Sequence, residues 1–146
     1  MLKRSVKFVD FNDEEQVQEC YFNISKSELT EMEMSRRGGF QAYITQILEA
    51  KNNKEIYALF KEIVLMSYGE KSADGGAFIK RKLVDGQMVR LRDEFEQSLA
   101  FDALMMELIA SGEEGVAEFI NAVIPKEIAE EIAKQIASGN LIPPTK

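Results

Sequence analysis

Residues 101 to 125 read FDALMMELIASGEEGVAEFINAVIP, and this stretch decides the predicted fold. Apolar residues recur in it twice at the spacing i, i+3, i+4, i+7, i+8, which places them on one face of an α-helix. SGEEG separates the two sets and Pro125 follows the second, and glycine and proline favour helix ends at such places. The stretch therefore predicts two amphipathic helices, with the stripes Phe101, Leu104, Met105, Leu108 and Ile109, then Val116, Phe119, Ile120, Val123 and Ile124.

The same template occurs twice earlier in the chain, and two further helices complete the prediction. Burial of one such stripe contributes about 7 to 15 kcal/mol, whereas ordering a dozen backbone residues costs about 1 to 2 kcal/mol each. No such helix is stable alone, so the helices are expected to pack together through short connections. The further stripes are Phe40, Tyr43, Ile44, Ile47 and Leu48; Ile56, Leu59, Phe60, Ile63 and Val64; the weaker Met88, Leu91 and Phe95; and Ile128, Ile132 and Ile136, in a last helix from Pro125 to about Gly139.

The N-terminal residues have a different pattern. Val6 and Phe8 alternate with polar residues, and the β-favouring run VQECYF follows a polar turn around residues 12 and 13, which predicts a β-hairpin. Ser25 then precedes Glu28 by the spacing of a capping box, so a short helix is expected over residues 26 to 35.

Together these patterns predict a mainly α protein, with a short N-terminal β-hairpin followed by a compact bundle of roughly six or seven short helices. We expect a single domain over residues 1–138, with the hairpin at 1–23 and the helical part at 25–138, and a frayed tail at 139–146. A chain of 146 residues, 45% of them apolar, is long enough to bury a core of this kind.

Composition excludes several classes of function. The formal charge of −7 opposes binding to nucleic acid or to an anionic membrane, because both need clustered cations. One cysteine and no histidine leave no disulfide and no multi-cysteine or mixed zinc site, which favours a reducing, intracellular setting. No leader-like apolar segment and no run of 18 apolar residues is present, so a soluble protein is expected.

The stretch SYGEKSADGGAFIKRK, residues 67 to 82, resembles a phosphate-binding loop in composition. Lys71 and Ser72 match the end of a Walker motif, but Leu65 and Glu70 occupy the two glycine positions, and a carboxylate there would repel phosphate. A nucleotide site is therefore not predicted. Gly69, Gly75 and Gly76 instead favour a change of chain direction between helices.

The sequence supports a metal site or a catalytic site no better than it supports a nucleotide site. Asp10, Asn12 and Glu14 fall at EF-hand ligand positions, but Glu15 replaces the turn glycine and Tyr21 replaces the bidentate glutamate. Cys20 has no histidine to activate it, so it is expected to be a half-buried structural side chain. A catalytic carboxylate pair stays open, since acidic residues are plentiful and none is singled out. No enzyme activity, cofactor or metal is predicted.

Cations and methionines suggest contact surfaces instead. The basic run Lys80–Lys82, with Arg90 and Arg92 nearby, is interpreted first as a solvated surface and second as a site for an acidic protein partner. Seven methionines are many for this length, and methionine provides adaptable apolar surface. Met105 lies on its helical stripe and is expected in the core, whereas Met106 falls off the stripe and is expected to be exposed.

Three segments carry a resemblance to a known family: YFNISKSELTEMEMS at 21 to 35, SYGEKSADGGAFIK at 67 to 80, and EFEQSLAFDALMMELIASGEEGVAEFINAVIP at 94 to 125. In order and spacing they resemble the tail assembly chaperones of long-tailed bacteriophages of Gram-positive hosts. The stretch between residues 80 and 94 is longer than the family pattern implies, and the predicted helix after Pro125 has no counterpart in it.

The resemblance implies a non-enzymatic protein that coats the tape measure protein, keeps it soluble and yields to tail tube subunits as the tube polymerises. It implies action in the host cytoplasm, absence from the mature virion, and the short form of a pair produced by a ribosomal frameshift. The implied partners are the tape measure protein, the tail tube protein, the frameshifted long form and a second copy of this chain. The alternative is a structural virion component, such as a tail completion or joining protein.

Candidate partner-contacting residues follow from the methionine surface and from the loop that carries part of the resemblance. Lys71 and Asp74 are interpreted as a pair that orders the loop or contacts a partner. The full set is Met32, Met34, Lys71, Asp74, Phe78 and Met106.

Overall fold

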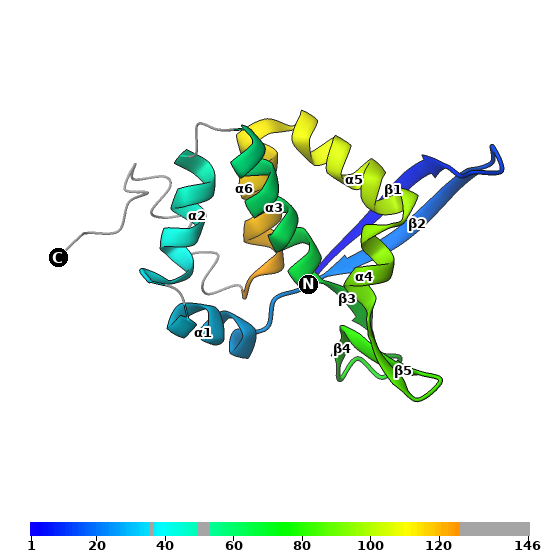
Figure 1. Ribbon diagram of the computed structural model, residues 1–146, viewed down its shortest axis with the longest axis horizontal. Coiled ribbons are helices and arrows are strands. Elements are labelled where there is room, and N and C mark those ends of the chain that lie inside the picture. Colours follow the sequence, from blue (N-terminus) through cyan, green and yellow to red (C-terminus); the bar gives the residue numbers. More distant parts are fainter. Residues whose placement is uncertain (36, 50–52, 126–146) are drawn as a thin grey trace.

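The computed structural model describes residues 1–35, 37–49 and 53–125, which form a mixed α/β structure (Figure 1). The strands are β1 (Leu2–Val9), β2 (Glu15–Phe22), β3 (Tyr68–Lys71), β4 (Phe78–Ile79), β5 (Arg81–Val84) and β6 (Gln87–Arg90). The helices are α1 (Lys26–Ser35), α2 (Gly39–Glu49), α3 (Asn53–Ser67), α4 (Leu91–Glu96), α5 (Leu99–Ala110) and α6 (Gly112–Val123).

Four of the strands form one antiparallel sheet in the order β1-β2-β3-β4, and β5 pairs with β6 as a separate hairpin. The β1–β2 ladder runs from the pair Leu2–Phe22 to the pair Val9–Glu15 and extends away from the helices (Figure 1). Only the end of β2 pairs with β3, at Tyr21–Gly69 and Phe22–Tyr68. The sheet therefore joins the N-terminal hairpin to the segment that follows α3.

The prediction of a mainly α protein with a bundle of roughly six or seven helices is wrong, because residues 68 to 90 contain four strands. Asp85 and Gly86 adopt φ of 51° and 80° and join β5 to β6 in a two-residue hairpin connection. An Asp-Gly pair favours this geometry because both residues tolerate positive φ. Met88 accordingly lies on β6 and does not belong to a helical stripe.

The glycine-rich stretch was also wrongly expected to connect helices. It follows α3 directly as β3, turns through residues 72 to 77, and returns as β4. Gly69 is required by packing, because a Cβ there would lie 2.6 Å from the carbonyl oxygen of Ile79 on the paired strand. Gly75 has φ of 77° and serves the turn itself.

The core forms where α3, α5 and α6 meet the sheet. Phe119 of α6 lies at its centre, with ring centroids 5.2 Å from Phe22 and 5.7 Å from Phe60 in edge-to-face contacts. Every member of the α6 stripe is buried, and all of the α5 stripe except Ile109. These parts of the helical prediction are confirmed.

The predicted helix over residues 26 to 35 is confirmed as α1, and so is its capping box. The Ser25 amide donates to Glu28 Oε1 at 2.9 Å, and the Glu28 amide donates to Ser25 Oγ at 3.1 Å. Two helix-end donors are thus satisfied reciprocally.

Other sequence predictions fall partly outside the described residues. On α2, Tyr43 is buried as its stripe predicts, but the other four stripe side chains lie outside what the structure describes. So do the last helix after Pro125 and the tail at 139–146. The single domain over 1–138 stays a prediction.

Candidate interaction surfaces

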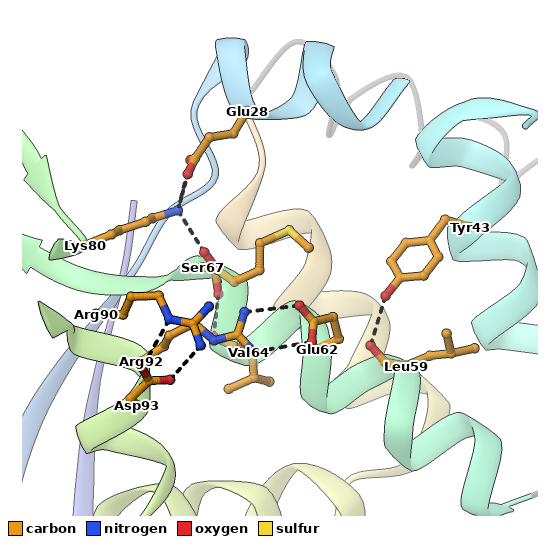
Figure 2. A network of polar contacts seen from close by, with 11 residues as sticks. Glu28, Tyr43, Leu59, Glu62, Val64, Ser67, Lys80, Arg90, Arg92 and Asp93 are labelled. Carbon is orange, nitrogen blue, oxygen red and sulfur yellow. Dashed lines mark hydrogen bonds and ion pairs between the residues drawn. The ribbon is translucent and has the colours of Figure 1, made fainter. Parts of the chain in front are cut away.

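A partly buried ammonium group links three segments that are far apart in the sequence. Lys80 Nζ donates to Glu28 Oε1 at 2.9 Å, to Glu28 Oε2 at 2.8 Å and to the carbonyl oxygen of Met66 at 2.8 Å (Figure 2). Met66 lies in the last turn of α3, where carbonyl groups lack partners within the helix. Lys80 therefore closes the end of α3 and ties it to α1.

The pKa values of Lys80 and Glu28 are both lowered in the folded chain, but for different reasons. Burial lowers the pKa of Lys80, and its hydrogen bonds to Glu28 offset this only in part. Burial also disfavours the Glu28 carboxylate, but hydrogen bonds from Lys80 and Ser25 outweigh it and hold the pKa of Glu28 below its ordinary value. The lysine is the less exposed partner, at 21% against 39% for the glutamate side chain.

Three more ion pairs hold the segment from β5 to α4. Arg92 donates through both terminal nitrogens to Glu62 of α3 at 3.1 and 3.3 Å, and Arg90 makes a similar fork to Asp93 (Figure 2). A third pair joins Lys82 Nζ to Glu70 Oε1 at 2.7 Å. Most of the basic run predicted from the sequence therefore anchors this segment to the body of the protein.

A cavity of about 370 Å³ lies beside this network. We call it the basic cavity, although carboxylates from α1 also line it. Arg81 is exposed there and forms no ion pair within the described part of the chain. The lining residues are Glu28, Glu31, Leu65, Met66, Tyr68, Lys80, Arg81, Arg90 and Arg92.

Catalytic chemistry is not supported by the described residues. They contain no group of three or more histidine, cysteine, aspartate or glutamate side chains placed to hold a metal ion. Burial raises the pKa of the Cys20 thiol to about 11, so its nucleophilic thiolate form is scarce at neutral pH. None of the helices in the described ranges has the length and apolar character needed to cross a membrane.

Comparison with protein-family models supplies the identification. The model of a phage tail assembly chaperone family matches residues 1–144. The chain belongs to this family. The resemblance inferred from the sequence is thereby confirmed, and the protein is an assembly chaperone, not an enzyme. Comparisons with curated proteins and with solved structures gave no match.

The predicted contact methionines of the chaperone lie in different environments. Met34 is 76% exposed on α1 and Met106 is 54% exposed on α5, whereas Met32 is 8% exposed and packs into the core. Met105 is buried, so the helical phase deduced from the α5 stripe separated the two adjacent methionines correctly.

The predicted contact residues of the loop also lie in different environments. Asp74 Oδ1 accepts from Ser72 Oγ at 2.7 Å and from the Gly76 amide at 2.9 Å, and these bonds order the turn. Lys71 is exposed and makes no part of that network. Phe78 is half-buried and lies 5.8 Å from Lys80 Nζ, measured from its ring centroid.

Sequence reasoning missed a group of exposed apolar residues of the chaperone, which lie on its two protruding hairpins. Their alternation within short runs, and the Asp-Gly pair of the second hairpin, were the available signals. The residues are Val9, Phe11, Val17, Leu83, Val84 and Met88.

Proposed function

We propose that this chaperone binds the tape measure protein in the host cytoplasm, keeps it soluble, and releases it to polymerising tail tube subunits. Membership of the tail assembly chaperone family supports an assembly role, because a chaperone acts on other tail components. The exposed apolar face of α5 is the observation that carries the choice of contact surface.

That face, which we call the α5 patch, consists of Met106 and Ile109. Their exposed fractions are 54% and 44%, and a separation of three residues places them side by side on the helix. Asp102, one turn earlier, is also exposed. Such a patch suits the apolar stripe of a partner helix, and methionine adapts to stripes of different shape.

Charge supports the solubilising role. A net charge of −7 on the chaperone gives a loaded complex a repulsive surface, which opposes aggregation of the long client. Release of the tape measure protein then requires only that tail tube subunits compete with the chaperone for the same apolar stripe of that client. Under this proposal a frameshifted long form, if the gene produces one, is a further partner through the shared residues.

The direct test is coexpression of the tape measure protein with Met106→Asp. The change removes about 1.5 to 3 kcal/mol of burial and places a carboxylate in an apolar contact, so affinity for the client should fall at least about tenfold. The client should become insoluble while the circular dichroism of the chaperone stays unchanged.

Ala58→Asp is the matched control, because it adds the same charge at an exposed position on α3. It should leave client solubility at the wild-type level. Equal solubilisation of the client by Met106→Asp and wild type would show that the α5 patch is not the contact surface. A client that stays insoluble with wild-type chaperone would contradict the proposed function itself.

The structural alternative makes a different prediction. A tail completion or joining protein stays in the particle, whereas a released chaperone does not. Quantitative mass spectrometry of purified virions should find this chain absent or at trace level. A stoichiometric amount would favour the structural role.

A further inference from the structure

The basic cavity has an excess of positive charge in a chain that is acidic as a whole. The net charge of the chain is −7. Cations gathered in a concave site concentrate the electric field there, so the cavity is a candidate binding site for an anionic group. Its charged lining consists of the cations Lys80, Arg81, Arg90 and Arg92 and the carboxylates Glu28 and Glu31.

Two of the cations lie opposite each other across the β5–β6 ladder. Arg81 pairs with Arg90 in the register of the hairpin, which places their Cβ atoms about 5 Å apart on one face. Like charges in this arrangement destabilise a sheet. Asp93 compensates Arg90, whereas Arg81 forms no ion pair within the described part of the chain. An anion between the two guanidinium groups would relieve the remaining repulsion.

The guanidinium group of Arg90 retains donors for such an anion. Its bonds to Asp93 use Nε and Nη2, at 3.1 and 3.0 Å, and leave both N–H groups of Nη1. The fork to Asp93 also fixes the Arg90 side chain, just as the fork to Glu62 fixes Arg92 (Figure 2). A side chain that is fixed before binding loses less entropy when it donates to a ligand.

The wall of the cavity that comes from α1 has the opposite charge and narrows the choice of ligand. Glu31 is exposed there and, like Arg81, forms no ion pair with the residues that the structure describes. Glu28 and Glu31 would repel a phosphate dianion. A polypeptide segment suits both walls, because an acidic side chain can accept from the arginines while neighbouring backbone N–H groups donate to Glu31.

The remaining lining of the cavity is largely apolar. Leu65 and Met66 come from α3, and Tyr68 comes from β3. The volume of about 370 Å³ lies in the range of ligand pockets, which begins at about 300 Å³. The cavity therefore has room for an acidic side chain together with an apolar neighbour.

We propose that the basic cavity binds an acidic segment of a partner protein. An aspartate or glutamate side chain of that segment lies between Arg81 and Arg90, and an adjacent apolar side chain contacts Met66 and Tyr68. Within the described ranges no residue of α5 lines the cavity, so the α5 patch stays free for the tape measure protein. The chaperone thus has two separate contact surfaces, one apolar and one cationic, and can hold two segments at once.

Methyl NMR of the full chain, labelled with ¹³C in its methionine methyl groups, tests this assignment. The probe is an acetylated and amidated peptide of sequence Gly-Ser-Glu-Leu-Ser-Gly, whose only charge is the glutamate carboxylate. Titration should shift the Met66 signal and leave the signal of Met106 on the α5 patch unchanged. The same peptide with glutamine in place of glutamate should bind at least about tenfold more weakly, because it lacks the charge-assisted hydrogen bonds.

Two substitutions locate the contact. Arg81→Gln should raise the dissociation constant of the glutamate peptide about tenfold or more. Because Arg81 is exposed, this variant should keep the wild-type signal of the buried Met105, which reports an intact core. Lys7→Gln is the matched control, since it removes one positive charge from an exposed position on β1 outside the cavity and should have no effect.

Four results would overturn the inference. An unchanged Met66 signal would exclude binding in the cavity, and equal affinity for the glutamate and glutamine peptides would exclude a carboxylate contact. Tighter binding of inorganic phosphate than of the glutamate peptide would assign the cavity to a phosphate ligand. Binding only of acetylated Gly-Ser-Gln-Leu with a free C-terminal carboxylate would assign it to a chain end. The tape measure protein is absent from these measurements, so none of them bears on its binding at the α5 patch.

Discussion

Replacing Lys80 with methionine removes the link between α1 and the end of α3 while keeping most of the side-chain volume. The ion pair with Glu28 contributes about 1 kcal/mol, since the glutamate is 39% exposed and partly screened by solvent. The Met66 carbonyl, left without its ammonium donor, adds about 1 kcal/mol. We therefore expect Lys80→Met to lower the free energy of unfolding by about 2 kcal/mol.

Urea denaturation measures this change. With a slope of about 2 kcal/mol per molar urea, the midpoint should fall by about 1 M. Lys82→Met is the matched control, because the Lys82–Glu70 pair is almost half exposed on both sides and contributes at most about 0.5 kcal/mol. Equal midpoint shifts for the two variants, or a shift below about 0.25 M for Lys80→Met, would refute the anchoring role of Lys80.

The same contact gives a pH dependence with a defined sign. The pKa of Glu28 is lower in the folded chain than its ordinary value of 4.5, so the ionised carboxylate stabilises the fold above that value. This stability is lost as the pH falls through 4.5 and below. The difference in unfolding free energy between wild type and Glu28→Gln should therefore shrink between about pH 5 and pH 3. A constant difference over that range would contradict the ion pair.

Three further outcomes are expected. Cys20, whose burial raises its pKa to about 11, should resist a thiol reagent at neutral pH until urea unfolds the chain. Phe119→Ala should lower the free energy of unfolding by about 3 to 5 kcal/mol, because the Phe119 ring lies in the core. Phe11→Ala should change it by less than about 0.5 kcal/mol, because the Phe11 ring is exposed. Gly86→Ala should cost about 1 to 2 kcal/mol in urea denaturation, because φ at this position is 80°; an unchanged midpoint would contradict the hairpin geometry.

The sequence predicted helices well because their signals are local. The α6 stripe repeats within three turns, and the Ser25–Glu28 capping box lies within one, so neither depends on the rest of the fold. The phase of the α5 stripe also predicted that Met106 is exposed and Met105 buried.

The strands after α3 were missed for two reasons. β3 pairs with β2 across a long stretch of chain, at Phe22–Tyr68, and sequence periodicity carries no information on such a partner. The β5–β6 hairpin did have a local signal at Asp85 and Gly86, but Met88 lies at helical spacing from the true helix residues of α4 and was assigned to them.

The contact surfaces could be predicted only in part. Lys80 and Glu28 are 52 positions apart, so the anchoring role of the basic run depends on the tertiary fold. Exposure of Phe11 depends on how far the first hairpin extends beyond the helices, which its own alternation does not determine. Met32 is buried because α1 turns that side chain toward the core, and no stripe predicted it.

Methionine oxidation of the tape measure complex tests the central claim most directly. Hydrogen peroxide converts exposed methionine to the sulfoxide, and mass spectrometry reports each position separately. In the free chaperone Met106 should oxidise readily and the buried Met105 slowly. Binding of the tape measure protein should slow the oxidation of Met106 and leave that of Met88 unchanged, whereas an unchanged rate at Met106 in a stable complex would contradict the account.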